Sequence, residues 1–244
     1  MVSPAFLSLL GFAAAVFAGP LQPRILAADD VVLLKHDGTS QIMKAAEYEA
    51  LEAATAAAAA PAAPALAAAP LPLHNIDAHG MARRSCNQSN EVQVMSDESF
   101  VDSDIVMSPL VSSAGGEATV SIEDGFTLSE HLSFHGQITL GGPKVVSVSL
   151  NKKFDRTWTT SQTNTIRFSL PPGRYGVVVS QPYVRRVQGF LLSGCTDSPA
   201  RTAFEAKTYE NQSYGELSWV RGVIRMCSSE TYPIPYCIGD GHHE

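Results

Sequence analysis

Beyond residue 90 the chain alternates short apolar segments with turn signals, and this pattern rules out most architectures. The turn signals include Asp124-Gly125, Gly141-Gly142-Pro143 and Pro171-Pro172-Gly173. Short alternating runs bounded in this way are typical of β-strands. We therefore predict an all-β region, an antiparallel β-sandwich or an elongated β-domain, with strands at 91–95, 105–111, 118–122, 135–140, 175–180, 184–191, 203–209 and 217–224.

The strongest alternation lies between Val146 and Trp158. Val146, Val148 and Leu150 share one parity, and serine or asparagine residues occupy the other. Period-two alternation indicates a strand with one buried and one solvated face. A second alternating run at 166–170 follows a polar turn, so we predict a long hairpin between Val146 and Leu170. Whether this hairpin is structural or inserts into a membrane is left open by the sequence.

The N-terminus is typical of a secretory signal peptide. An apolar run at 6–17 ends at Ala18, with small residues at the positions that a signal peptidase recognises. Twelve helical residues span about 18 Å, too little for a bilayer core of about 30 Å. We predict a signal peptide at 1–18, a secreted protein and an oxidising environment for its cysteines.

Residues 19–84 have the features of a pro-segment. A strand at 30–34, a turn at 36–39 and a helix at 43–54 come first, and a spacer at 53–69 rich in alanine and proline follows. The repeated prolines oppose a continuous helix, so the spacer is predicted to be a linker. The Arg83-Arg84 pair ends this stretch and is the kind of site that a kexin-like secretory protease cuts. The predicted mature domain is 85–244.

Four cysteines lie beyond the dibasic pair. Three pairings are possible, and the sequence does not rank them firmly. The short separation of Cys227 and Cys237 makes a bridge between them geometrically plausible, which leaves Cys86 with Cys195. Their spacing matches no common zinc module, so we predict disulfides and no metal. Asn87 and Asn211 begin glycosylation sequons, which would face solvent if occupied.

No catalytic constellation stands out, and neither an enzymatic activity nor a cofactor is predicted. A nucleophile elbow and a phosphate-binding glycine loop are both missing from the sequence. The net charge of −7 argues against a nucleic-acid partner, because binding phosphates requires an excess of Lys and Arg. The richest stretch of aromatic and basic residues contains Tyr175, Tyr183, Arg185 and Arg186. These side chains could bind a sugar or a carboxylate, but they are more often edge-strand residues that prevent aggregation.

Several motifs resemble those of secreted effector-like proteins of filamentous fungi, the celp type. They are Trp158-Thr159-Thr160-Ser161, the Ser169-Leu170-Pro171-Pro172-Gly173-Arg174-Tyr175-Gly176 turn, Arg185-Arg186-Val187-Gln188-Gly189, and the N-terminal strand, turn and helix. The resemblance implies an extracellular, non-enzymatic protein that acts on a host. The long alternating strands before a Pro-Pro-Gly turn also look like aerolysin-type pore-forming proteins. Lys152 and Arg156 lie on the apolar parity, where each would face lipid at a cost of roughly 2–4 kcal/mol, and this counts against the pore.

The sequence thus predicts a secreted, processed β-domain that binds an unknown extracellular protein or glycan. One alternative is a pore-forming toxin, and among the functions considered it alone would involve a membrane. Another is a lectin-like or carbohydrate-active domain that uses Trp158, Trp219 or Tyr183.

Overall fold

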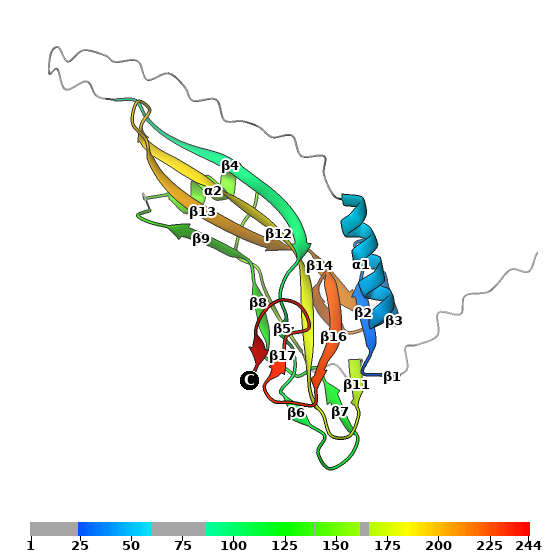
Figure 1. The fold of residues 1–244 in the computed structure, drawn as a ribbon. Coiled ribbons are helices and arrows are strands. Elements are labelled where there is room, and N and C mark those ends of the chain that lie inside the picture. The colour runs from blue at the N-terminus through cyan, green and yellow to red at the C-terminus, as the bar shows by residue number, and fades with distance from the viewer. Residues whose placement is uncertain (1–23, 60–85, 139, 162–165) are drawn as a thin grey trace, which may run out of the picture.

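One very long strand organises the fold. The structure is a computed structural model, and it describes residues 24–59, 86–138, 140–161 and 166–244. Strand β12 (Tyr175–Cys195) has 21 residues and extends along an elongated, curved molecule from its lower part to its far tip (Figure 1). Its first eight residues pair with β16 (Gly222–Ser229), and the rest pair with β13 (Ala200–Tyr209) and β4 (Gln88–Val101). A single strand therefore belongs to two differently paired halves of one sheet.

The first half, which we call the body, is a two-layer β-structure. One layer contains β3 (Ser40–Lys44), β2 (Asp30–Leu34), β16, β12, β5 (Ile105–Val106) and β6 (Val111–Ser112). A smaller sheet contains β1 (Arg24–Leu26), β11 (Ile166–Leu170) and β7 (Ala118–Ser121). Fully buried Phe168 from the small sheet and Trp219 belong to one apolar core. Burial of these apolar surfaces holds the two layers together.

Short strand pairs complete the body. They are β8 (Thr127–Ser129) with β10 (Thr157–Thr159), β14 (Asn211–Tyr214) with β15 (Leu217–Val220), and β17 (Ile234–Pro235) with β18 (His242–His243).

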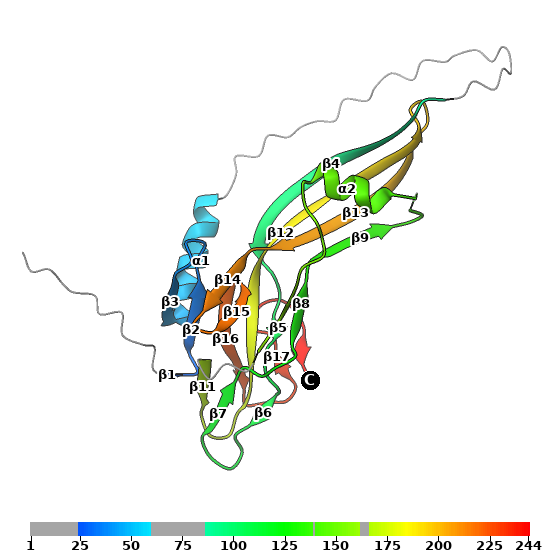
Figure 2. The ribbon, with the colours of Figure 1, turned by 180° about the vertical axis from the view of Figure 1, so that it is seen from behind.

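The second half, which we call the arm, is a four-stranded antiparallel sheet covered on one face. Its strands are β4, β12, β13 and β9 (His131–His135), and helix α2 (Gly142–Ser149) lies against them (Figure 2). Val146 of α2 packs with Leu191 and Phe204 of the sheet. The opposite face presents Arg186, Gln188 and Glu205. One apolar and one polar face are typical of antiparallel sheets that face water on one side.

The predicted all-β, elongated domain is confirmed. Two predicted segments, 175–180 and 184–191, are parts of the same strand, and the predicted strand at 105–111 is divided between β5 and β6. The segment at 217–224 is divided between β15 and β16. The prediction at 135–140 is displaced, because β9 ends at His135. The predicted turn at Gly173 is confirmed, with φ at +76°.

The strand predicted from Val146 to Trp158 is wrong, and the long hairpin to Leu170 does not form. Residues 142–149 are helical, β10 pairs with β8, and β11 pairs with β1 and β7. The helix begins after Gly141, whose φ is +88°, and Pro143 lies in its first turn, where a missing N–H has no cost. Val146 and Leu150 are four residues apart, so both face the arm sheet from a helix. Val148, which the strand prediction buried, is 71% exposed.

The N-terminal segment is more extensive than predicted. The strand at 30–34 is confirmed as β2, but β3 was missed, and helix α1 spans Ala45–Ala59. The helix therefore includes the first alanines of the predicted linker, which precede Pro61. The Glu47 carboxylate accepts a hydrogen bond from the Lys44 N–H at 3.2 Å, as in a capping box at a helix N-terminus.

The predicted disulfides are present, and of the three possible pairings the structure contains the one that the short separation of Cys227 and Cys237 made plausible. Cys86 is bonded to Cys195 and Cys227 to Cys237. Asn87 and Asn211 are exposed, as an occupied sequon requires, and their glycosylation stays a prediction. The predicted processing residues Ala18, Arg83 and Arg84 lie outside the described residues. In the part of the chain that the structure describes, no helix is long and apolar enough to cross a bilayer.

Candidate functional site: a groove at the bend of the long strand

Tyr183 lies where β12 changes its partners. Pro182 is the last residue that pairs with β16, and Tyr183 is the first that pairs with β4. Proline lacks an N–H and interrupts a ladder, so it fits the point where one set of hydrogen bonds ends and another begins. The Tyr183 N–H donates to the Arg221 carbonyl oxygen at 2.9 Å. The backbone hydrogen bond therefore fixes the point at which the Tyr183 side chain leaves the strand.

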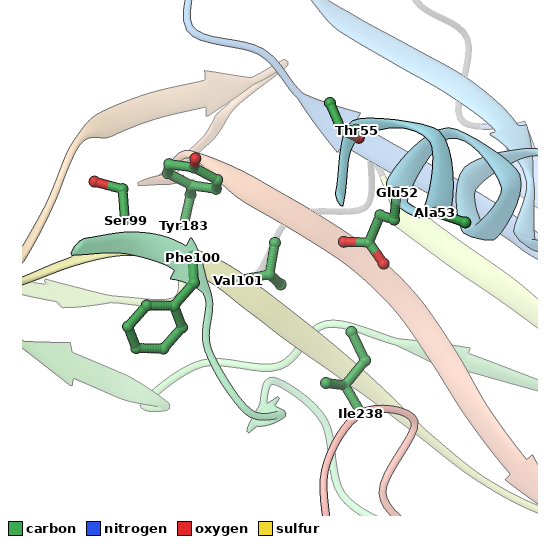
Figure 3. A pocket seen from close by; sticks show the side chains of 8 residues that line it. All are labelled: Glu52, Ala53, Thr55, Ser99, Phe100, Val101, Tyr183 and Ile238. Atoms are coloured by element: carbon green, nitrogen blue, oxygen red, sulfur yellow. The ribbon is translucent and has the colours of Figure 1, made fainter. Parts of the chain in front are cut away.

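Three cavities meet at this side chain. The largest, about 600 Å³, lies between α1 and the end of β4 and is also lined by Ile238. Figure 3 shows Glu52, which extends from α1, on the same side of the cavity as Ile238 of the C-terminal segment, with Val101 beside them. A second cavity of about 330 Å³ contains Tyr209 and several charged groups, and a third of about 300 Å³ lies beside Tyr48. Tyr183 lines all three, and we call them together the Tyr183 groove.

The two arginines of the groove, Arg185 and Arg221, are already paired. Arg185 donates two hydrogen bonds to Asp97, at 2.8 and 2.6 Å. This bond holds the pKa of the Asp97 carboxyl below its usual value. Arg221 pairs with Glu210 at 3.2 Å, and its guanidinium carbon lies 4.2 Å from the centre of the Tyr183 ring. Because both guanidinium groups are neutralised locally, the part of the groove around them offers an aromatic face and polar atoms more than a free guanidinium.

A buried ion pair supports the second cavity. Lys152 contacts the fully buried Glu130 carboxylate at 2.9 Å. Neighbouring Tyr209 is 6% exposed, and Trp158 packs edge-on against its ring with the centroids 5.9 Å apart. Burial, and then the negative charges of Asp102 and Glu130, raise the pKa of Tyr209 to about 12.

We expect Tyr209 to make stability sensitive to alkaline pH. The fold favours the neutral phenol, so its contribution is complete below the ordinary pKa of about 10 and is lost as pH rises from there towards about 12. Tyr209→Phe should flatten this part of the curve of unfolding free energy against pH. Phenolate absorbance and urea unfolding between pH 9 and about 11.5 would measure it, and an unchanged curve in the variant would contradict the assignment. Tyr48, whose pKa is also raised by burial, contributes to the dependence that remains in this variant.

A buried carboxylate positions the C-terminal wall of the groove. Asp104 accepts hydrogen bonds from the Gln181 side chain at 2.7 Å and from the Cys237 N–H at 2.6 Å, and its Oδ2 lies 3.2 Å from His243 Nε2. These contacts hold the segment that contains Ile238 beside β12. Asp104, His243 and Cys227 are the one group of potential metal ligands that converge among the described residues. The Cys227 sulfur is in a disulfide, so no thiolate is offered to a metal there.

The structure brings together only part of the predicted site. Tyr183 and Arg185 line the groove. Arg186 instead lies over the Phe100 ring and pairs with Glu98, and Tyr175 lies at the far end of β12 beside Tyr232. Trp158 is 7% exposed and Trp219 is completely buried, so neither indole presents a face on which a sugar could stack.

Other residues of the groove were missed by sequence reasoning. Glu52 comes from α1, Val101 from the end of β4 and Ile238 from the C-terminal segment. Nothing in their local sequence marks them, since only the bend of β12 brings these distant segments together. Arg221, which lies inside the predicted strand at 217–224, could have been suspected from its position beside Trp219 and Val220.

The comparisons with known proteins give one match. A family model described as a family of unknown function, DUF6060, matches residues 82–231, which is more than half of the 244 residues. No curated protein and no solved structure matches the chain. The matched region contains β4 to β16 and therefore the strand bend with Tyr183 and Arg185. The chain belongs to the DUF6060 family.

Proposed function

We propose that this protein is a secreted, effector-like, non-catalytic binding protein that is cut after Arg84 and recognises an extracellular partner, a host protein or glycan, through the Tyr183 groove. The observation that carries the proposal is the groove itself. It combines an accessible aromatic ring, apolar side chains and paired charges at a fixed bend, which are the features of binding pockets.

The predicted cut bears directly on this groove. One of its walls is α1, which precedes the dibasic pair, while Tyr183 and Ile238 follow it. Cutting the linker would leave α1 attached to the groove by non-covalent contacts alone. A partner could then displace α1 and occupy the larger surface beneath it, so processing would regulate access.

The two alternatives receive different support. The pore-forming alternative relied on an amphipathic hairpin between Val146 and Leu170, and these residues form α2, β10 and β11 instead. The lectin-like alternative keeps one of its three aromatic candidates, Tyr183, because both indoles are buried. Glycan recognition is therefore retained as one form of the proposed binding.

A binding screen with matched variants tests the proposal. The intact and the cut protein are applied to a glycan array and to a panel of immobilised extracellular receptor domains. We expect the cut protein to bind a probe and Tyr183→Ala to weaken that binding at least tenfold, because a central aromatic residue commonly dominates an interface. Tyr232→Ala is the control, since this ring is 55% exposed and lies outside the groove.

Other results would contradict the proposal. Equal loss of binding in the Tyr183 and Tyr232 variants would place the binding surface elsewhere. Sustained release of dye from liposomes by the cut protein would favour the pore-forming alternative. Chemical conversion of a bound probe would show an enzyme.

A further inference from the structure

The N-terminal segment, residues 24–59, is built into the body. Strand β1 pairs in parallel with β11, and four residues of β2 pair with β16. Both faces of β2 are covered, because Val32 and Leu34 lie in the main core and Val31 packs with Tyr48 and Val223. A strand buried on both faces is an integral layer of a fold.

The surface that receives this segment is a strand edge. Without β2, the backbone groups of β16 from Gly222 to Arg225 would lose their partners on that side. Val223 and Ile224 are buried in the complete fold, and Tyr48 of α1 covers Val223. An apolar edge of this kind recruits another strand readily, because both main-chain hydrogen bonds and apolar burial are gained.

Charge complementarity adds specificity to this contact. The Arg225 side chain is 13% exposed, and its guanidinium lies 3.6 Å from the Glu49 carboxylate of α1. On the other side of the segment, the Gln212 amide donates to the Thr39 carbonyl oxygen at 3.4 Å. These polar contacts fix the orientation of a segment whose apolar side chains supply the burial.

No disulfide joins the segment to the remaining chain. Both bridges connect residues between 86 and 237, so the linker at 60–85 is the covalent connection. The dibasic pair lies in that linker, and the family match begins at residue 82, after the segment.

We infer that the edge of β16 is a strand-acceptor site whose occupant is the segment 24–59, held non-covalently and exchangeable in trans once the linker is cut. A cut protein is then a two-chain complex, and a segment with the β2 pattern of apolar residues on both faces can replace the original one. The inference uses the proposed cut and does not depend on the proposed extracellular partner.

Strand exchange tests the inference on the full chain. A protease recognition sequence inserted within 60–82 makes the cut independent of natural processing. After cutting, we expect the two pieces to co-elute from a native sizing column and to separate only in denaturant. A tenfold excess of a fluorescent peptide of residues 24–59 should then replace most of the original segment, while far-ultraviolet circular dichroism stays β.

Peptide variants provide the control without altering the folded protein. Val32→Asp in the peptide places a carboxylate in the core opposite Ile224, and we expect it to compete at least a hundredfold more weakly. Gln41→Asp changes an exposed residue of β3 and should compete as well as the unmodified peptide.

Three results would overturn the inference. In the first, the cut protein takes up no labelled peptide. In the second, the Val32→Asp peptide competes as well as the unmodified peptide. In the third, the cut protein forms a dimer without taking up label. The last would assign the β16 edge to a second copy of the chain.

Discussion

Replacing Asp104 by alanine is expected to lower the free energy of unfolding by about 3–5 kcal/mol, the usual cost of removing one partner of a buried charged group. The Asp104 and His243 side chains are 0% and 3% exposed. Removing the carboxylate would leave three buried groups without their partner: the Gln181 amide, the Cys237 N–H and the His243 ring. Water cannot readily replace the carboxylate there, so each group would keep an unmet hydrogen bond. The C-terminal wall of the groove would loosen first, because these contacts attach it to β12.

Urea unfolding of Asp104→Ala at neutral pH measures this effect. Asp197→Ala is the matched control, because Asp197 is an exposed turn residue and its loss should change stability by no more than about 0.5 kcal/mol. Asp104→Asn keeps the side-chain size and one acceptor oxygen, so an intermediate loss is expected. A change below about 1 kcal/mol in the alanine variant would show that the carboxylate does not anchor the C-terminal segment.

Removing the bridge between Cys86 and Cys195 should have an effect of similar size. This bridge spans 109 residues and joins the chain just before β4 to the end of β12 at the tip of the arm. On the chain-entropy account, a loop of this length stabilises the folded state by about 4–5 kcal/mol, because it restricts the unfolded chain. The double variant Cys86→Ser with Cys195→Ser should therefore unfold at a much lower denaturant concentration.

The second bridge gives the comparison. Cys227 and Cys237 are 10 residues apart, so the same account predicts about 3 kcal/mol for Cys227→Ser with Cys237→Ser. Guanidinium unfolding of both double variants, followed by circular dichroism, separates the two contributions. A smaller loss for the long bridge than for the short one would show that native contacts, and not loop length, decide their contributions.

The position of the groove follows from the length of β12. Two separate strands could move independently. One continuous strand instead fixes the orientation of the body relative to the arm, with Tyr183 at the junction. Proline at the junction restricts the backbone further. The groove is therefore pre-organised on the β12 side, and α1 is the wall that the proposed cut would free.

The sequence alone determined the fold class, most strand positions and the presence of disulfides, and it left three cystine pairings open. The run at 175–180 and Asp30–Leu34 are apolar enough to be strands wherever they pack, and Pro171-Pro172-Gly173 turns the chain in any context. The short separation between Cys227 and Cys237 similarly favours their pairing without knowledge of the fold. These features depend on interactions between residues that are close in the sequence, so they can be predicted without knowledge of the fold.

Tertiary structure alone decided the identity of the 142–149 helix and the composition of the groove. The valines and serines after Pro143 fit a strand by alternation and a helix by four-residue spacing, and the arm sheet selects the helix because Val146 and Leu150 then pack together on it. Burial of Trp158 and Trp219 likewise depends on which layers meet. Glu52, Tyr183 and Ile238 converge only because β12 bends with distant segments on either side, and contacts between residues so far apart in the sequence leave no local pattern to read.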